Sequence, residues 1–216
     1  MRLLVFGATG ATGRQLVRLA LESGHHVTAF VREPARLTMT SDRLDAVTGD
    51  VMLPARVDAA VPGHEAVLVA LGTMPEDRQD RHRRRPRDPV CSVGTGNIVS
   101  SMIRHGVRRL VVETSLGVGE SRSASQMGAA TLVRCFLKDV MDDKERQEAN
   151  VRRSQLDWTL VRPARLTNGP RTSGPRWGES LKWSLMSTVS RADVAAFMLG
   201  AIADTRTYFK ALSLIS

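Results

Sequence analysis

Cysteine is scarce in this sequence, which has two cysteines, Cys91 and Cys135, among 216 residues. They lie far apart and lack the spacing of metal-ligand pairs, so the pattern predicts free thiols, no disulfide framework and no metal site. A chain of this length can bury a substantial core without cross-links. We therefore expect a single domain over residues 1–216.

Long apolar runs and aromatic residues are scarce as well. No run approaches the roughly 20 residues that a membrane-spanning helix requires, and an expected strand starts too near residue 1 to leave room for a signal peptide. We therefore expect a cytoplasmic protein without membrane contact. Aromatic residues make up 4% of the chain, so few rings are available to stack on nucleic-acid bases.

The formal net charge of +9 raises the question of a nucleic-acid partner. Of the 31 basic residues four are lysines, and the arginines are spread along the whole chain. This distribution does not favour nucleic acid and fits a surface that attracts small anions. The densest stretch, 78–87, is interpreted as either a solvated loop or a surface for an anionic substrate or a protein partner.

Short apolar runs alternate with longer stretches of helical periodicity, which is typical of βαβ units. We expect strands at 3–6, 26–31, 45–48, 66–71, 109–112, 158–161 and 210–215, and helices at 13–23, 54–61, 96–105, 129–154 and 191–203. Residues 75–89 and 163–178 are expected to form loops. The pattern predicts an α/β fold of the Rossmann type: a doubly wound parallel sheet with helices on both faces.

A glycine-rich turn joins the first expected strand to the first expected helix. It reads Gly7-Ala8-Thr9-Gly10-Ala11-Thr12-Gly13. Glycines let a ligand approach the backbone, and the unpaired amides and positive end of the following helix attract a pyrophosphate. Because a buried strand precedes it and a helix follows, the turn predicts a dinucleotide site in which Thr9 and Thr12 add hydroxyl donors.

The residues after the second expected strand bear on which dinucleotide binds. Arg32 follows that strand directly, and Arg36 can return to the same place across a turn. Guanidinium groups match the 2′-phosphate of NADP, whereas Glu33 would instead hold the ribose hydroxyls of NAD. We expect NADP(H). The alternatives are NAD, or an Arg32 that is an ordinary solvated surface residue.

Further motifs, together with the glycine turn, resemble those of a known family. They are Gly49-Asp50-Val51, Leu71-Gly72-Thr73, Val112-Glu113-Thr114-Ser115, Trp158-Thr159-Leu160-Val161-Arg162-Pro163 and Ser190-Arg191-Ala192-Asp193-Val194-Ala195. Along nearly its whole length the sequence resembles the atypical short-chain dehydrogenases/reductases of the NAD(P)-binding, NmrA-like type. Within that type it is most similar to the flavin reductases, also called biliverdin-IXβ reductases.

The resemblance implies where several residues lie around the cofactor. Asp50-Val51 would flank the adenine, and Leu71-Gly72-Thr73 would run beside the ribose nearest the nicotinamide. Thr114-Ser115 would lie next to the nicotinamide ring, which Pro163-Ala164 would approach from the loop after the sixth strand. These positions agree with the rule that open α/β sheets bind ligands at the carboxyl ends of their strands.

The chain departs from the short-chain dehydrogenase pattern at one residue. Many of those enzymes pair a catalytic tyrosine with a lysine four residues later. Lys144 stands at the lysine position, but Val140 stands where the tyrosine would be, and Tyr208 is the only tyrosine. The flavin reductases that this sequence resembles also lack the tyrosine.

Two residues are predicted to be catalytic. Ser115 would donate a hydrogen bond to the acceptor, and Lys144, with Arg165, would stabilise the incoming charge. The alternatives are that Ser115 caps backbone groups at a strand end and that Lys144 forms a solvated pair with Glu148.

The substrate end is expected to be built from loops around 73–95, 115–140 and 163–190. Four apolar residues in the last two of these segments form either a lining for a planar acceptor or ordinary core packing. They are Met127, Trp177, Trp183 and Met186.

The sequence thus predicts an NADPH-dependent reductase that transfers hydride to a flavin, a quinone or a similar conjugated small molecule. Such a planar acceptor spreads the incoming charge and can take its proton from solvent. Two alternatives stay open. One is an NADP(H)-binding redox-sensing regulator that signals to a protein partner, and the other is a natural-product tailoring reductase or isomerase.

Overall fold

The computed structural model describes residues 1–72, 89–126 and 128–216. The strands are β1 (Arg2–Phe6), β2 (His26–Val31), β3 (Leu44–Thr48), β4 (Ala66–Val69), β5 (Arg109–Glu113), β6 (Asp157–Pro163), β7 (Arg165–Thr167), β8 (Arg176–Gly178), β9 (Thr188–Ser190) and β10 (Lys210–Ile215). The α-helices are α1 (Ala11–Glu22), α2 (Pro54–Ala60), α3 (Val90–His105), α4 (Ala129–Arg153) and α5 (Arg191–Ala201). Short 3-10 helices are η1 (Pro34–Arg36), η3 (Gly119–Arg122) and η4 (Thr205–Thr207).

The main sheet has the strand order β3-β2-β1-β4-β5-β6-β10-β8. Its strands pair in parallel except at one edge, where β8 runs antiparallel to β10. A second, two-stranded sheet joins β7 to β9 in parallel. The chain order reverses direction between β1 and β4, so the carboxyl ends of these two strands flank the crevice in which doubly wound folds bind ligands.

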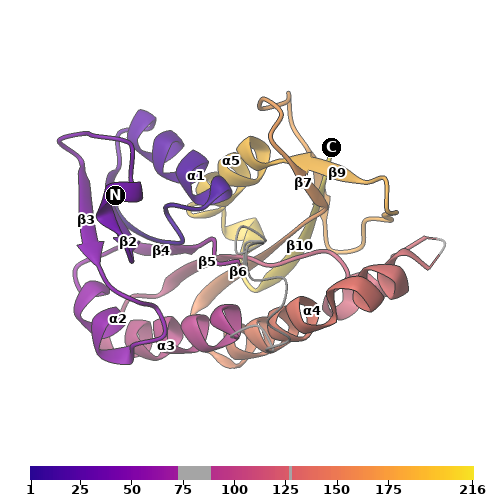
Figure 1. The fold of residues 1–216 in the computed structure, drawn as a ribbon, viewed down its shortest axis with the longest axis horizontal. Coiled ribbons are helices and arrows are strands. Elements are labelled where there is room, and N and C mark those ends of the chain that lie inside the picture. Colours follow the sequence, from indigo (N-terminus) through magenta and orange to yellow (C-terminus); the bar gives the residue numbers. More distant parts are fainter. Residues whose placement is uncertain (73–88, 127) are drawn as a thin grey trace, which may run out of the picture.

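Helices cover both faces of the sheet, with α1 and α5 on one face and α2, α3 and α4 on the other (Figure 1). The central strands are therefore buried on both sides, which explains their unbroken apolar runs. The side chains of alternate residues of β1 pack into two separate hydrophobic cores. Leu3 and Val5 pack into the core beneath α1 and α5, whereas Leu4 and Phe6 pack into the core beneath α2 and α3.

The predicted Rossmann-type fold is confirmed, and most element boundaries fall within two residues of the expected ones. Three differences are larger or concern type. Helix α3 begins at Val90 and not at 96, the predicted loop 163–178 contains β7 and β8, and β9 was not expected. The single domain over 1–216 stays a prediction, and residues 75–88 of the other expected loop lie outside the described residues.

Helix α4 is broken at Leu137, whose φ of −127° and ψ of 33° are not helical. Across the break, Arg134 donates to Asp142 at 2.5 Å and to Glu145 at 3.3 Å. A straight helix separates residues eleven apart by roughly 16 Å along its axis, so the second contact requires the bend.

Candidate functional site

The glycine turn is built so that no side chain can be added at its two ends. Gly7 has φ +80°, and a Cβ there would lie 2.3 Å from the carbonyl oxygen of Ala70. A Cβ on Gly13 would lie 2.0 Å from the carbonyl oxygen of Gly7. Gly10 is the N-cap of α1 and supplies no side-chain cap. The turn therefore offers the positive end of α1 and its first amides to an anionic ligand.

The hydroxyl of Thr12 is directed inward, toward the end of β5. Its Oγ1 donates to Oε1 of Glu113 at 3.1 Å, and both side chains are buried. The side chain of Thr12 thus joins α1 to β5, and its role as a hydroxyl donor to phosphate stays a prediction. Thr9, by contrast, lies partly exposed in the turn. The backbone amide of Thr12 keeps its place in the first turn of α1.

Glu113 occupies the carboxyl end of β5 and was not predicted as a site residue. Burial raises the pKa of its carboxyl group, while the positive charge of Lys144, the Thr12 hydroxyl and the charge of Arg191 oppose that rise. A buried carboxyl group thus lies directly beneath the first turn of α1. No local sequence signal marks it, because its partner Thr12 is 101 residues away.

Arg32 and Arg36 lie near the carboxyl end of β2. The pairing of Phe6 with Phe30 places Arg32, two residues beyond Phe30, at the level of the glycine turn. Both arginines are exposed, and Arg36 ends η1. Arg32 therefore lies at the same edge of the sheet as the glycine turn. Whether the two residues bind phosphate stays a prediction.

The residues predicted for the adenine end pack against α3. Val51 is buried, and a Cβ added to Gly94 would lie 2.8 Å from its side chain and 3.2 Å from Leu71. Asn97 donates to the carbonyl oxygen of Val51 at 2.9 Å. Gly94 and Asn97 were missed. Gly94 precedes the expected helix 96–105, so the signal of a glycine inside a helix could not be recognised there.

The other residues predicted beside the adenine and the ribose are Asp50, between β3 and α2, and Gly72 and Thr73, which follow β4 in the sequence. Asp50 accepts from the amide of Met52 at 2.9 Å and is partly exposed. Gly72 is exposed, and Thr73 lies outside the described residues. Their contacts with cofactor stay predictions.

Lys144 is buried between two strand ends. Its Nζ donates to the carbonyl oxygens of Leu71, at 2.9 Å, and of Glu113, at 3.0 Å. The alternative of a solvated Lys144–Glu148 pair is therefore wrong: Lys144 is 6% exposed and Glu148 is 3% exposed. Lysine has three N–H donors, and two of them join the segments that follow β4 and end β5.

Thr114 and Ser115 continue from β5 with different surroundings. Oγ1 of Thr114 donates to Oε1 of Glu148 at 3.0 Å in a buried position. Oγ of Ser115 donates to the carbonyl oxygen of Leu116 at 3.1 Å and is partly exposed. The contact of Ser115 is local, so both its backbone-capping role and its predicted role toward an acceptor stay open to test.

The segment after β6 is connected directly to the segment after β5. Leu116 donates its amide to the carbonyl oxygen of Pro163 at 3.1 Å, and the amide of Ala164 donates to the carbonyl oxygen of Leu214 at 3.0 Å. The predicted positions 114–115 and 163–164 are therefore neighbours. Arg165, the first residue of β7, is exposed beside them.

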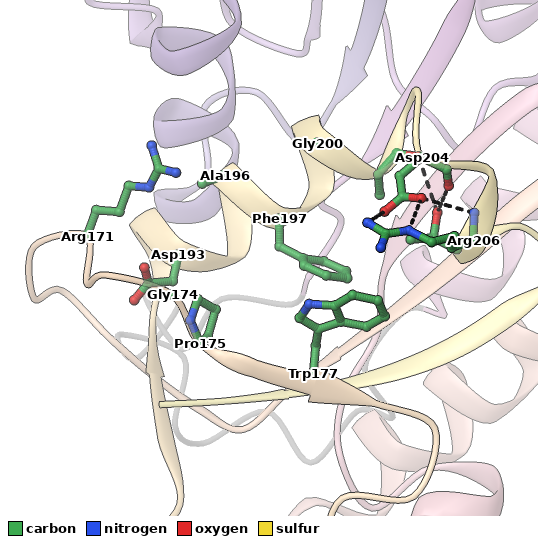
Figure 2. Close-up of a pocket in the computed structure, with 12 residues that line it drawn as sticks. Arg171, Gly174, Pro175, Trp177, Asp193, Ala196, Phe197, Gly200, Asp204 and Arg206 are labelled. Atoms are coloured by element: carbon green, nitrogen blue, oxygen red, sulfur yellow. Dashed lines mark hydrogen bonds and ion pairs between the residues drawn. The ribbon is translucent and has the colours of Figure 1, made fainter.

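The expected aromatic lining is not assembled as one surface. Trp183 is buried, and its Nε1 donates to the carbonyl oxygen of Ser121, so core packing is its role. Trp177 faces Phe197 of α5, with ring centroids 5.5 Å apart, in an open groove at the β8 edge (Figure 2). Met186 is 81% exposed. Met127 lies outside the described residues.

The single tyrosine lies away from this site. Oη of Tyr208 donates to the carbonyl oxygen of Ile202, and its ring lies 4.1 Å from the guanidinium carbon of Arg109. Arg109 begins β5, so Tyr208 is at the edge of the sheet opposite to the glycine turn. A role for this tyrosine as the proton donor of a short-chain dehydrogenase is excluded by that position.

The chain matches a family model described as NAD(P)H-binding over residues 7–205. It therefore belongs to the NAD(P)H-binding family. An uncharacterized chloroplastic protein of Arabidopsis thaliana, At2g34460, is 28% identical over 220 residues that cover all of this chain and 76% of that protein. Five further curated relatives are longer, and the match covers less than half of each.

Solved structures share the whole fold. The anaerobillin reductase ChuY from Escherichia coli O157:H7 is similar with a TM-score of 0.81 and 23% identity, covering 100% of this chain and 97% of that one. A short-chain dehydrogenase/reductase from Veillonella parvula DSM 2008, in complex with NADP, is similar with a TM-score of 0.79 and 19% identity, covering 99% and 93%. At these identities the likeness establishes the fold.

Within the described ranges, no helix is both long and apolar enough to cross a bilayer. The arginine-rich stretch 78–87 lies outside those ranges, and its two interpretations stay as they were.

Proposed function

We propose that this chain is an NADPH-dependent reductase that transfers hydride to a planar conjugated acceptor, such as a flavin, a quinone or a linear tetrapyrrole. The observation that carries the proposal is the uncapped first turn of α1 behind a glycine turn that excludes a Cβ at Gly7 and at Gly13. It lies at the carboxyl ends of β1 and β4, where Lys144 joins the neighbouring strand ends. We also propose that the protein is located in the cytoplasm.

The residues of the site fit the phosphate groups of a dinucleotide. The first turn of α1 supplies amides and a positive end for the pyrophosphate. Arg32 and Arg36 supply guanidinium groups for a 2′-phosphate, which favours NADP(H) over NAD(H). The NADP complex of a protein with the same fold supports this choice. When bound, NADPH supplies the hydride, and the chain holds and orients it.

At the nicotinamide end, two side chains act on charge and orientation. Lys144 keeps one N–H beyond its two carbonyl contacts, and we assign that donor to the ribose hydroxyls or to the charge that develops on the acceptor. Ser115, which is partly exposed after the end of β5, donates to the acceptor when its hydroxyl rotates away from the carbonyl oxygen of Leu116. Neither side chain has to act as a strong acid.

The choice of acceptor follows from the proton that the reaction needs. Because the only tyrosine lies at the opposite edge of the sheet, the acceptor must accept a proton from water or from a weak hydroxyl donor. A conjugated acceptor meets that requirement since it delocalises the incoming charge. That a protein of the same fold is an anaerobillin reductase supports the choice of a conjugated acceptor such as a linear tetrapyrrole.

The test is oxidation of NADPH and of NADH with FMN, riboflavin, simple quinones and biliverdin, followed by the absorbance of the reduced nicotinamide. We expect turnover that prefers NADPH. Arg32→Ala should weaken NADPH binding about 10- to 100-fold and leave NADH binding unchanged, because a hydrogen bond to a charged group contributes about 1.5–3 kcal/mol.

Arg43→Ala is the matched control, since Arg43 is an exposed arginine that precedes β3 at the opposite edge of the sheet. An equal loss of NADPH affinity in both variants would remove the phosphate assignment. NADPH binding without turnover on any acceptor would favour the redox-sensing regulator or a narrowly specific tailoring enzyme. No binding of either nucleotide would overturn the proposal.

A further inference from the structure

A buried ion pair lies directly beneath Thr114. Nη2 of Arg162 lies 2.5 Å from Oε2 of Glu148, and Nε of Arg162 donates to Oε1 of Glu148 at 2.9 Å. The two side chains are 1% and 3% exposed. The same Oε1 accepts the hydroxyl of Thr114 at 3.0 Å. A bidentate pair of this kind fixes both position and orientation.

The pair joins three elements that meet at the carboxyl end of the sheet. Thr114 follows β5, Glu148 belongs to α4, and Arg162 belongs to β6 and precedes Pro163. The hydroxyl of Thr114 donates its hydrogen to Glu148, so Glu148 fixes the orientation of the Thr114 side chain. Positions 114 and 163 are those that the family resemblance would place beside the nicotinamide.

A second contact leads from the pair to the loop after β5. Nη2 of Arg162 also donates to Oε2 of Glu120 at 2.8 Å, and Arg152 donates to the same oxygen at 2.9 Å. Glu120 is the exposed member, with 67% of its side chain accessible. Gly119 lets the contact form, because a Cβ there would lie 2.4 Å from Nη2 of Arg162.

The loop that contains Glu120 is fixed in turn to the segment 181–187. Ser121 accepts the amide of Gly117 at 3.0 Å, and its carbonyl oxygen accepts Nε1 of Trp183 at 2.7 Å. Gln126 donates to the carbonyl oxygen of Trp183 at 2.7 Å. Both segments belong to the expected substrate end, so a shift of Glu120 moves the surroundings of the acceptor.

We propose that Glu148, Arg162 and Glu120 are positioning residues that set the Thr114 hydroxyl at the nicotinamide and hold the loop 117–126 against the acceptor. The role rests on the proposed function, because it refers to the same cofactor and acceptor. Glu148 acts on the cofactor side through Thr114. Glu120 acts on the acceptor side through the loop. One buried guanidinium group, that of Arg162, joins the two.

The first test uses Glu120→Gln, which keeps shape and removes charge at an exposed position and therefore leaves the fold intact. Steady-state kinetics should give an acceptor KM raised about three- to fivefold, in line with the small energy of an exposed ion pair. NADPH Kd, kcat at saturating acceptor and Tm should stay at their wild-type values. Glu22→Gln, an exposed acid paired with Arg18 at the far end of α1, is the matched control.

The second test separates positioning from folding on the cofactor side. Thr114→Val should lower kcat about tenfold or more, as expected when a group is misplaced by a fraction of an ångström, and Thr114→Ser should restore it. Glu148→Asp should lower kcat in the wild type and have little further effect in the Thr114→Val background, because coupled residues are not additive.

The outcomes distinguish this inference from the proposed function. Wild-type protein that oxidises no NADPH overturns both. Wild-type turnover with an unchanged acceptor KM in Glu120→Gln overturns the acceptor side. Additive losses of kcat in the double variant would show that Glu148 acts independently of Thr114, and a change in Tm alone would show that Glu148 serves only stability. Either result overturns the cofactor side.

Discussion

At the scale of single residues, Glu113 places a titratable group beneath the first turn of α1. Its carboxyl group is buried, accepts from Thr12 in the first turn of α1, and faces the charges of Lys144 and Arg191. Burial raises the pKa, so the folded state holds the proton at a pH where the unfolded chain has released it. The corresponding stability is fully present below the unfolded pKa and is lost as pH rises through the folded pKa.

We expect the affinity for NADPH to follow the same direction. An ionised Glu113 would place a negative charge beneath the pyrophosphate, so binding should weaken as pH rises through the folded pKa of this group. Titrations of NADPH over a range of pH, with wild type and Glu113→Gln, measure the effect. Because the phosphates of NADPH titrate equally in both proteins, the difference between the two curves isolates Glu113. Parallel curves would contradict the prediction.

Single residues also mark how far sequence reasoning reaches. The glycine turn was predictable because its strand, its glycines and its helix are consecutive. The inward hydroxyl of Thr12 and the buried position of Lys144 were not, since their partners are 101 and 73 or 31 residues away. A lysine and a glutamate four residues apart look like a solvated pair until the folded chain buries both.

At the scale of elements, helix α3 is capped by another helix. Its N-cap residue, Pro89, offers no side-chain cap. Instead the carboxylate of Asp143, in α4, accepts the amides of Cys91 at 2.9 Å and of Ser92 at 3.0 Å. The cap is buried and places a carboxylate at the positive end of α3.

Removing this cap should destabilise the protein without touching the cofactor. We expect Asp143→Ala to lower the free energy of unfolding by about 1–3 kcal/mol, because two buried amides lose their acceptor, and Asp143→Asn to cost less. Urea denaturation measures both. Asp139→Ala, at an exposed acid one turn earlier in α4, is the control and should stay close to wild type. Equal midpoints for the two alanine variants would refute the capping role.

The same contact explains why the start of α3 was missed. Residues 90–95 carry a glycine and β-branched side chains with no local capping signal, and their cap lies 51 and 52 residues away. Strands β7, β8 and β9 were not predicted from the sequence for a related reason. Each has three residues, too few for a periodic pattern, and each exists through pairing with a distant strand.

At the scale of the whole molecule, Arg109 joins the elements at the edge of the sheet opposite to the site. Its guanidinium group donates to the carbonyl oxygens of Ala201 and Asp157, both at 2.5 Å, and to Oγ1 of Thr159 at 2.7 Å. Burial lowers its pKa to about 10, so it stays charged at neutral pH. It thereby binds the end of α5 and the start of β6 to β5.

Arg109→Met should therefore lower the free energy of unfolding by about 2–5 kcal/mol, since several buried carbonyl groups lose their donor. NADPH affinity should not change. Arg108→Met is the control, because the neighbouring arginine has a 63% exposed side chain whose pair with Asp157 contributes about 1 kcal/mol or less. Urea unfolding of both variants gives the comparison. A smaller loss for Arg109→Met than for Arg108→Met would contradict this account.

The overall architecture was predictable because alternating apolar runs and amphipathic stretches leave few arrangements other than a parallel sheet with helices on both faces. The position of β10 in that sheet was not predictable. The sequence pattern predicts a strand at residues 210–215. It does not predict that this strand pairs with β6 on one side and with the antiparallel β8 on the other.

That position of β10 has a consequence for the time course of synthesis. Edge strand β8 pairs only with β10 in the described sheet, and the amide of Ala164 needs the carbonyl oxygen of Leu214. The half of the sheet that contains the glycine turn has all its strands by residue 69. The other half, with the wall after β6, waits until residues 210–215 have left the ribosome. A nascent chain can therefore form its glycine turn well before it can form the segment after β6, where the acceptor is proposed to lie.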